Sequence, residues 1–144
     1  MSAKQLKLKI ITPERTVLEE MVDQVTLPTT EGEITILPGH IALVSALKSG
    51  DIVAKKDGEV IPMAVVGGFI EVKGDEVAVL ADFAEHVSEI SEEALSKAKA
   101  RAEELQKMKE NGEVVDFEHF ESELERSLTR VKVADKWRKK KYRM

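Results

Sequence analysis

The sequence predicts an antiparallel β-sandwich of short strands, followed by an antiparallel hairpin of two helices. In the first 88 residues, short segments alternate apolar and polar residues, which is typical of half-buried strands. Glycine-containing turn signals separate these segments every 7 to 11 residues. After residue 88, apolar residues recur at spacings of three and four, as in amphipathic helices. We therefore expect a β-sandwich domain over residues 1–88 and a helical hairpin over residues 89–144.

Short strands are expected in order at residues 6–10, 17–18, 25–27 and 34–36. Residues 77–81 are continuously apolar, which predicts a strand buried on both faces. Asp57-Gly58 is a signal for a two-residue type I′ hairpin, and Gly67-Gly68 is expected to form a turn or a bulge. No segment is left for crossover helices, so we do not expect a doubly wound parallel fold.

The two helices are expected at about residues 91–110 and 116–140. Ser91 is placed to cap the first helix, Asn111-Gly112 to end it, and Asp116 to cap the second. Each helix carries one apolar stripe. The first is made by residues 95, 98, 102, 105 and 108, and the second by residues 117, 120, 124, 128, 131 and either 134 or 135. A two-helix hairpin has a small core, so it should be the less stable part, able to open or to find another partner.

Composition excludes several classes of protein. The chain has no cysteine, which excludes disulfides and thiolate metal sites. Its six aromatic residues are too few to suggest a base-stacking surface. The longest run without a charged residue has 14 residues, shorter than the 20 or so that a membrane helix needs. The first residues lack the apolar stretch of a signal peptide, so we expect a mature cytosolic start.

Charge is distributed unevenly along the chain. Residues 126–144 carry nine Lys or Arg and one Asp, a net charge of +8, whereas residues 1–125 carry −13. Such asymmetry predicts that the basic end binds something acidic. A second interpretation is a solvated helix end whose cations interact favourably with the helix macrodipole.

No motif in the sequence indicates catalysis. A phosphate-binding loop of the form G-x-x-x-x-G-K-[ST] is missing. The three histidines, at positions 40, 86 and 119, have no metal-ligand spacing. We therefore expect no catalytic residue, no metal, no cofactor and no enzymatic activity of the chain itself.

The segment from Leu27 to Gly50 closely resembles the epsilon subunit of bacterial F-type ATP synthases. The Glu-Gly-Glu turn at 31–33, the Leu-Pro-Gly-His turn at 37–40 and the Leu-Lys-Ser-Gly turn at 47–50 carry the resemblance. Further matches are GGFIEV at 67–72, VAVLAD at 77–82 and LTRVKVADK at 128–136. The resemblance runs nearly end to end. It implies a non-catalytic subunit of the central stalk, which takes part in ATP synthesis and proton transport at the cytoplasmic face of the bacterial membrane.

The resemblance also implies partners for each domain. The β-domain would hold the gamma subunit and rest on the ring of c subunits, with Glu31, Glu33 and His40 at the ring. A local alternative for His40 is a turn residue bonded to the neighbouring backbone. The helical hairpin would fold against the β-domain, or extend along gamma into the head of alpha and beta subunits and inhibit ATP hydrolysis. Five cations would then meet an acidic segment of the beta subunit: Arg126, Arg130, Lys132, Lys136 and Arg138. The basic run at 139–143 goes beyond the usual end of the family.

Some relatives bind ATP at the start of the hairpin through Ile or Leu, Asp, two variable residues, Arg and Ala. In this chain the aligned segment is residues 90–95, with Ser91 in place of the acid and Ala94 in place of the arginine. Glu85 and Arg101 remain at flanking positions. Because the arginine is the natural phosphate partner, the resemblance implies weak or absent ATP binding, and no nucleotide-binding residue is assigned.

A different class of function remains open from the residues alone, namely a β-sandwich binding module with a basic helical arm for nucleic acid. The net charge of the C-terminal end favours it. The acidic remainder of the chain and the scarcity of aromatic residues oppose it, so no nucleic-acid partner is expected.

Overall fold

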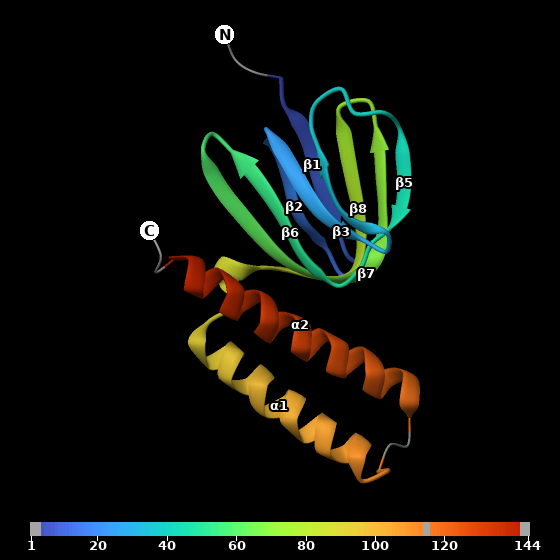
Figure 1. The fold of residues 1–144 in the computed structure, drawn as a ribbon, viewed down its shortest axis with the longest axis vertical. Helices are drawn as coiled ribbons and strands as arrows, with labels where there is room; N and C mark the ends of the chain where they lie inside the picture. The colour runs from blue at the N-terminus through green and yellow to red at the C-terminus, as the bar shows by residue number, and fades with distance from the viewer. Residues whose placement is uncertain (1–3, 114–115, 142–144) are drawn as a thin grey trace. The chain divides into compact units, whose positions relative to one another are not determined.

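The computed structural model describes residues 4–113 and 116–141 (Figure 1). The chain separates into two compact units, Met1–His86 and Val87–Met144. We call them the β-unit and the helical unit. The β-unit contains eight strands: β1 (Leu6–Ile11), β2 (Thr16–Val22), β3 (Gln24–Thr29), β4 (Gly32–Ile36), β5 (Leu43–Ala46), β6 (Gly50–Lys56), β7 (Glu59–Lys73) and β8 (Glu76–His86). Their hydrogen-bonded order is β2-β1-β8-β7-β6-β3-β4, with β5 paired to β7. The predicted class, a β-sandwich followed by two helices, is confirmed.

The expectation of a purely antiparallel sheet of short strands is wrong in two respects. Strands β1 and β8 pair in parallel, from Lys7 opposite Glu76 to Ile11 opposite Leu80. A parallel pair needs a connection of a dozen or more residues, and the six strands between β1 and β8 supply it without a crossover helix. Strands β7 and β8 are also long, with 15 and 11 residues.

Gly67 and Gly68 form neither a turn nor a bulge. They lie inside β7, and the register with β8 is the same before and after them. Their φ angles are +58° and +116°, a region that side chains rarely adopt. Before the two glycines, residues 59–65 of β7 pair with β6. After them, residues 69–72 pair with β5. A Cβ atom on Gly68 would collide with the carbonyl oxygen of Leu80, so the close approach of β7 and β8 requires glycine there.

The core of the β-unit is built from alternate residues of most strands. Leu6, Leu8 and Ile10 of β1 are fully buried, as their alternation with polar residues predicts. The expectation that residues 77–81 are buried on both faces is wrong. Val77, Val79 and Ala81 point into the core, whereas Leu80 is 55% exposed. One face of β8 therefore packs inside the sandwich and the other faces outward.

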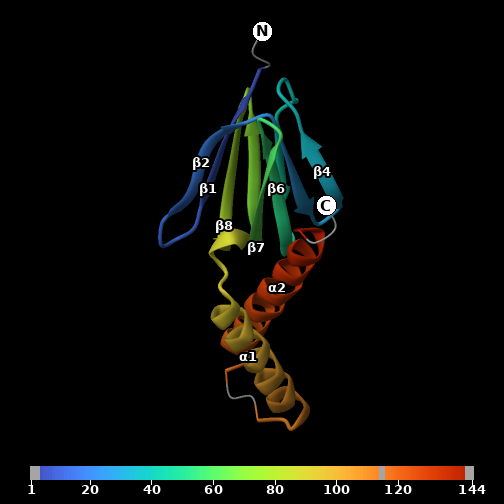
Figure 2. The ribbon, with the colours of Figure 1, turned by 90° about the vertical axis from the view of Figure 1, so that its left-hand side faces the viewer.

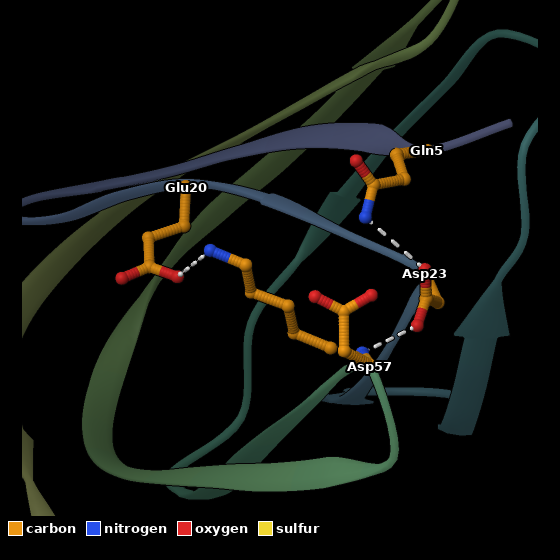
Figure 3. Close-up of polar contacts among 5 residues, drawn as sticks. Gln5, Glu20, Asp23 and Asp57 are labelled. Carbon is orange, nitrogen blue, oxygen red and sulfur yellow. Dashed lines mark hydrogen bonds and ion pairs between the residues drawn. The ribbon is translucent and has the colours of Figure 1, made fainter. Parts of the chain in front are cut away.

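The predicted turn at Asp57-Gly58 is confirmed, with φ angles of +50° and +82° between Lys56 and Glu59, which face each other across β6 and β7. Figure 3 shows how the carboxylate of Asp23 holds this turn. It accepts a hydrogen bond from the Asp57 backbone N–H at 2.8 Å and one from Gln5 Nε2 at 3.2 Å. Beside it, Lys56 Nζ lies 3.1 Å from Glu20 Oε2. These contacts connect the β6–β7 hairpin to the residue before β1, to β2 and to the residue between β2 and β3.

The helical unit contains a short 3-10 helix, η1 (Val87–Glu89), and two α-helices, α1 (Glu92–Glu110) and α2 (Phe117–Lys141). The predicted caps are confirmed. Ser91 Oγ accepts a hydrogen bond from the Ala94 N–H at 3.0 Å, and Asp116 Oδ1 accepts one from the His119 N–H at 3.2 Å. Asn111 is the C-cap of α1, and Gly112 follows it with φ of +69°. Figure 1 shows α1 and α2 running side by side in opposite directions, and in Figure 2 the two helices overlap.

Two small apolar clusters hold α1 against α2. One contains Ile90, Leu95 and Ala134, with Ala94 and Val131 at its edge. The other contains Leu105, Phe120 and Leu124, with Met108 at its edge. Leu128 was expected in this stripe but is 48% exposed. Successive steps of four residues drift around a helix, so the buried seam passes through Ser127 instead. The side chain of Phe117 lies outside the described residues.

Candidate functional site

An apolar row, exposed at three of its five residues and partly buried at the other two, crosses the outer face of the β-unit. Ala46, Phe69, Leu80 and Ile11 are direct partners across β5, β7, β8 and β1. Direct partners point to the same face of a sheet, so their side chains form one continuous line. Phe69 is 60% exposed and Leu80 55%. Val44, two residues before Ala46 and on the same face, is 73% exposed. We call these five residues the outer apolar row.

Sequence reasoning missed this row because residues 77–81 look like one uninterrupted core segment. The signal that could have revealed the row is the alternation of faces along a strand, which places Leu80 on the opposite face from Val79 and Ala81. Single exposed apolar side chains are ordinary on protein surfaces. A contiguous apolar group across four strands is a candidate surface for contact with another chain.

Glu31 lies in the turn before β4 and Glu33 in β4 itself, which is the last strand in the sheet order. The Glu31 backbone N–H donates to Thr29 Oγ1 at 3.2 Å, which shapes the turn between β3 and β4. Both glutamates are exposed. His40 follows β4 at its other end. The five residues of β4 span about 16 Å, so the structure does not bring Glu31 and His40 into contact with each other.

The loop at residues 37–42 presents His40 between two exposed apolar residues. His40 Nδ1 bonds to the carbonyl oxygen of Ile41 at 2.7 Å, so the local backbone bond considered for this residue is present. The Gly39 N–H donates to Asp75 Oδ1 at 3.1 Å, which attaches the loop to the turn between β7 and β8. Leu37 and Ile41 are 53% and 79% exposed. Sequence reasoning did not identify either of these two residues or Asp75.

The five predicted cations of α2 do not share one face. At about 100° per residue, the two residues from Arg130 to Lys132 turn the helix by about 200°. Arg126 and Arg130 therefore lie on one side and Lys132 and Lys136 on another. Arg138 Nη2 lies 2.7 Å from Glu92 Oε1 of α1, so this cation is already paired within the hairpin. Of the basic run at 139–143, only the side chain of residue 139 lies within the described part of the chain.

Two of the positions related to nucleotide binding, Ser91 and Arg101, make contacts within the hairpin. Arg101 Nε lies 2.6 Å from Glu123 Oε1, and Arg101 Nη2 lies 3.2 Å from Glu123 Oε2. Arg101 Nη1 lies 3.1 Å from Glu104 Oε2. The hydrogen bonds from Arg101 lower the pKa of the Glu123 carboxyl below its ordinary value. Ser91 serves as the helix cap described above, and Glu85 lies on β8, in the other unit.

Among residues 4–113 and 116–141, no group of three or more His, Asp or Glu side chains is arranged to hold a metal ion. In the same part of the chain, neither α1 nor α2 is apolar enough over its length to span a bilayer.

Comparisons with known proteins agree on one family. The family described as "ATP synthase, Delta/Epsilon chain, beta-sandwich domain" matches residues 5–87. The ATP synthase epsilon chain of Desulforamulus reducens is 41% identical over 133 residues, covering 92% of this chain and 99% of that one. The epsilon chain of Dehalococcoides mccartyi is 44% identical over 135 residues, covering 94% and 96%.

Among solved structures, the fold is similar to a chain in the Euglena gracilis mitochondrial ATP synthase, in a structure of OSCP, F1 and the c-ring. The TM-score is 0.63 at 24% identity, covering 92% of this chain and 79% of that chain. A chain from the central stalk and c-ring of the Tetrahymena thermophila mitochondrial ATP synthase gives a TM-score of 0.52 at 18% identity, covering 63% and 74%. At these identities the two likenesses establish the fold alone.

Proposed function

The chain belongs to the ATP synthase delta/epsilon family as an epsilon chain of the central stalk, and we propose that it has two separate tasks there. The β-unit couples rotation of the c-ring to the catalytic head. The helical unit restrains ATP hydrolysis by that head. The chain contributes no catalytic residue of its own. It works at the cytoplasmic face of the bacterial membrane, which it reaches only through the complex, and serves ATP synthesis and ion transport.

The outer apolar row is the observation that carries the coupling proposal. Its binding partner is the gamma subunit, because a rotor part must be fixed to the shaft with which it turns. Phe69 is the expected anchor, since aromatic residues at the centre of an interface supply much of the binding energy. Val44 and Leu80 flank it and exclude water from the contact.

The c-ring contact follows β4 and the loop after it. Glu31 and Glu33 mark one end of this strip and His40 the other. Leu37 and Ile41 add apolar area at the His40 end. Asp75 positions that end by holding Gly39, and the His40 ring is oriented by its bond to the Ile41 carbonyl. A contact about 16 Å long suits the surface of a ring better than a single pocket would.

The inhibitory contact uses the cations of α2. Because Arg126 and Arg130 point away from Lys132 and Lys136, a single flat partner cannot meet all of them. An extended α2 that enters a cleft in the head, with the acidic segment of a beta subunit on one side, would use both sets. Such charge pairs supply attraction and specificity, and salt weakens them.

The same helices do not bind ATP strongly. The natural phosphate partner is replaced by Ala94, and the three guanidinium nitrogens of Arg101 already face Glu123 and Glu104. Glu92 and Glu93 add negative charge beside the start of α1. Titration calorimetry of the full chain with ATP should give no micromolar binding. A micromolar affinity would contradict this part of the proposal.

The deciding experiment is ATP hydrolysis by a catalytic head that contains gamma but lacks this subunit. The head is titrated with the full chain and with residues 1–88 alone. Both should bind, and only the full chain should suppress turnover. If both bind and neither inhibits, the chain is a structural coupler only. If neither binds, the assignment of the outer apolar row to gamma is wrong.

A further inference from the structure

Ion pairs connect α1 to α2 along the hairpin. They include Lys109–Glu121 at 3.3 Å, Arg101–Glu123 at 2.6 Å, Lys99–Asp135 at 3.6 Å and Arg138–Glu92 at 2.7 Å. Helix α2 supplies the acid in the first three pairs and the base in the fourth. The antiparallel register therefore places opposite charges together at several levels.

These pairs lie on both sides of a thin apolar seam. Lys99 and Arg101 are two residues apart, so they leave α1 in directions about 200° apart. Between the two apolar clusters, α1 buries only Ala98 and Ala102 near this level, and alanine side chains bury little area. The charged pairs consequently contribute a larger share of the helix–helix attraction than they would beside a full core.

Arg101 makes the most complete of these contacts. Both oxygens of Glu123 accept from its guanidinium, and the remaining nitrogen faces Glu104. This fork geometry is specific to arginine and stronger than a single point contact. The pair is also partly shielded, with Arg101 42% and Glu123 32% exposed, whereas the Lys97–Glu93 pair along α1 is 77% and 80% exposed. Solvent and salt screen the shielded pair less.

We infer that the Arg101–Glu123 pair is a latch that keeps the two helices together, so that its strength sets how often the hairpin opens. The pair acts as a positioning element between the two helices. The effect of the latch on the helices stands on the contacts above. Its effect on ATP hydrolysis rests on the proposed inhibitory function.

Spin-label distances can test the latch directly in the full chain. The chain has no cysteine, so Ser96→Cys and Lys139→Cys, both at exposed positions, give two clean labelling sites near the open end of the hairpin. Pulsed electron–electron double resonance then measures the distances between the two spin labels and reports the fraction of molecules in which the distance is long. Arg101→Glu and Glu123→Arg should each raise that fraction about fivefold, as coupled contact pairs do. The double variant with both Arg101→Glu and Glu123→Arg should return the long-distance fraction to within twofold of its value in the labelled chain without these two changes.

The matched control is Lys97→Glu, which makes the same change in net charge on the same helix but breaks only a pair within α1. It should leave the distances unchanged. Circular dichroism separates opening from unfolding, because an opened hairpin keeps its helical signal. Glu123→Gln, which keeps the side-chain size, should raise the long-distance fraction without loss of that signal. The inference is overturned if the single variants leave the distribution unchanged, or if the swap fails to restore it.

Inhibition assays then separate the latch from the proposed function. If the extended hairpin inhibits, Arg101→Glu should suppress hydrolysis at about fivefold lower concentration, because the competent state is more populated. If the distances respond but no variant inhibits, the latch stands and the inhibitory function fails. If the distances do not respond while the unmodified chain inhibits, the inhibitory function stands and the latch fails.

Discussion

The β-unit and the helical unit are stabilised in different ways. Among the described residues of the β-unit, one cluster of 20 buried apolar residues forms the core. In the helical unit the two described clusters have three buried residues each, and ion pairs supplement them. Units with few buried contacts open at low free-energy cost, while densely packed ones open only on global unfolding. The difference suits one unit to hold a fixed position on a rotor and the other to change its contacts.

The largest effect is expected for Gly68→Ala in the β-unit. The new Cβ would collide with the Leu80 carbonyl at a φ of +116°, and backbone on both strands would have to move. We expect a loss of about 3–5 kcal/mol in the free energy of unfolding. Gly58→Ala is the control, since its φ is +82° but no atom lies within 4 Å, so it should cost about 1 kcal/mol. Equal losses for both variants would contradict the collision argument. Urea unfolding followed by circular dichroism measures the change.

Leu105→Ala tests the thin core of the helical unit. Leu105 is 1% exposed and belongs to one of the two clusters, so we expect a loss of about 2–4 kcal/mol. The only tryptophan, Trp137, and the only tyrosine both lie after residue 86, so tryptophan fluorescence follows this unit alone. The fluorescence transition should move to lower urea while the β-sheet signal keeps its midpoint. Gln106→Ala, at the exposed neighbour, should move neither. A common shift of both signals would mean that the two units unfold together.

Phe69→Asp should separate binding from stability. The side chain is 60% exposed, so the β-unit should keep its unfolding midpoint. Loss of an aromatic anchor should weaken binding to gamma about 30-fold. Val60→Asp, at an exposed position of the same strand outside the outer apolar row, is the control. Surface plasmon resonance with immobilised gamma measures both. If the two variants weaken binding equally, the outer apolar row is not part of the interface with gamma.

Ser91→Ala removes the cap of α1. The Ala94 N–H loses its acceptor, and we expect a loss of about 1 kcal/mol in the helical unit. Ser96→Ala, in the exposed middle of the same helix, should change stability by much less. Thermal melting followed by Trp137 fluorescence compares the two. If both variants had the same melting temperature as the unmodified chain, the cap would not contribute to the stability of the helical unit.

The smallest effect is expected from pH. The pKa of Glu123 is lowered in the folded chain, mainly by the hydrogen bonds from Arg101. A carboxyl whose folded pKa is below its unfolded value of about 4.3 stabilises the fold above that value. This stabilisation is lost as pH falls through the folded pKa. The Trp137 transition should therefore weaken below about pH 4.3, and Glu123→Gln should reduce this dependence. If the pH dependence of the transition were the same in Glu123→Gln, the loss of stability at low pH would come from other carboxyl groups.

Much of the fold was predictable because it depends on residues close together in the sequence. The caps at Ser91 and Asp116 and the turn at Asp57-Gly58 need only a few neighbouring residues to form. The two helical stripes follow from a period that is visible over 15 to 20 residues. For the same reason, the change from strands to helices could be read directly from the chain.

Other features depend on which distant segments meet, and only the tertiary structure decided them. A period of two shows that a strand has two faces but not which neighbour lies beside it. The parallel pairing of β1 with β8 and the line from Phe69 to Leu80 therefore could not be predicted. Likewise, Arg101 and Glu123 are 22 positions apart, and only the register of α1 against α2 makes them partners. Local sequence determined the elements of this protein, while long-range packing decided which of their surfaces remain open for other chains.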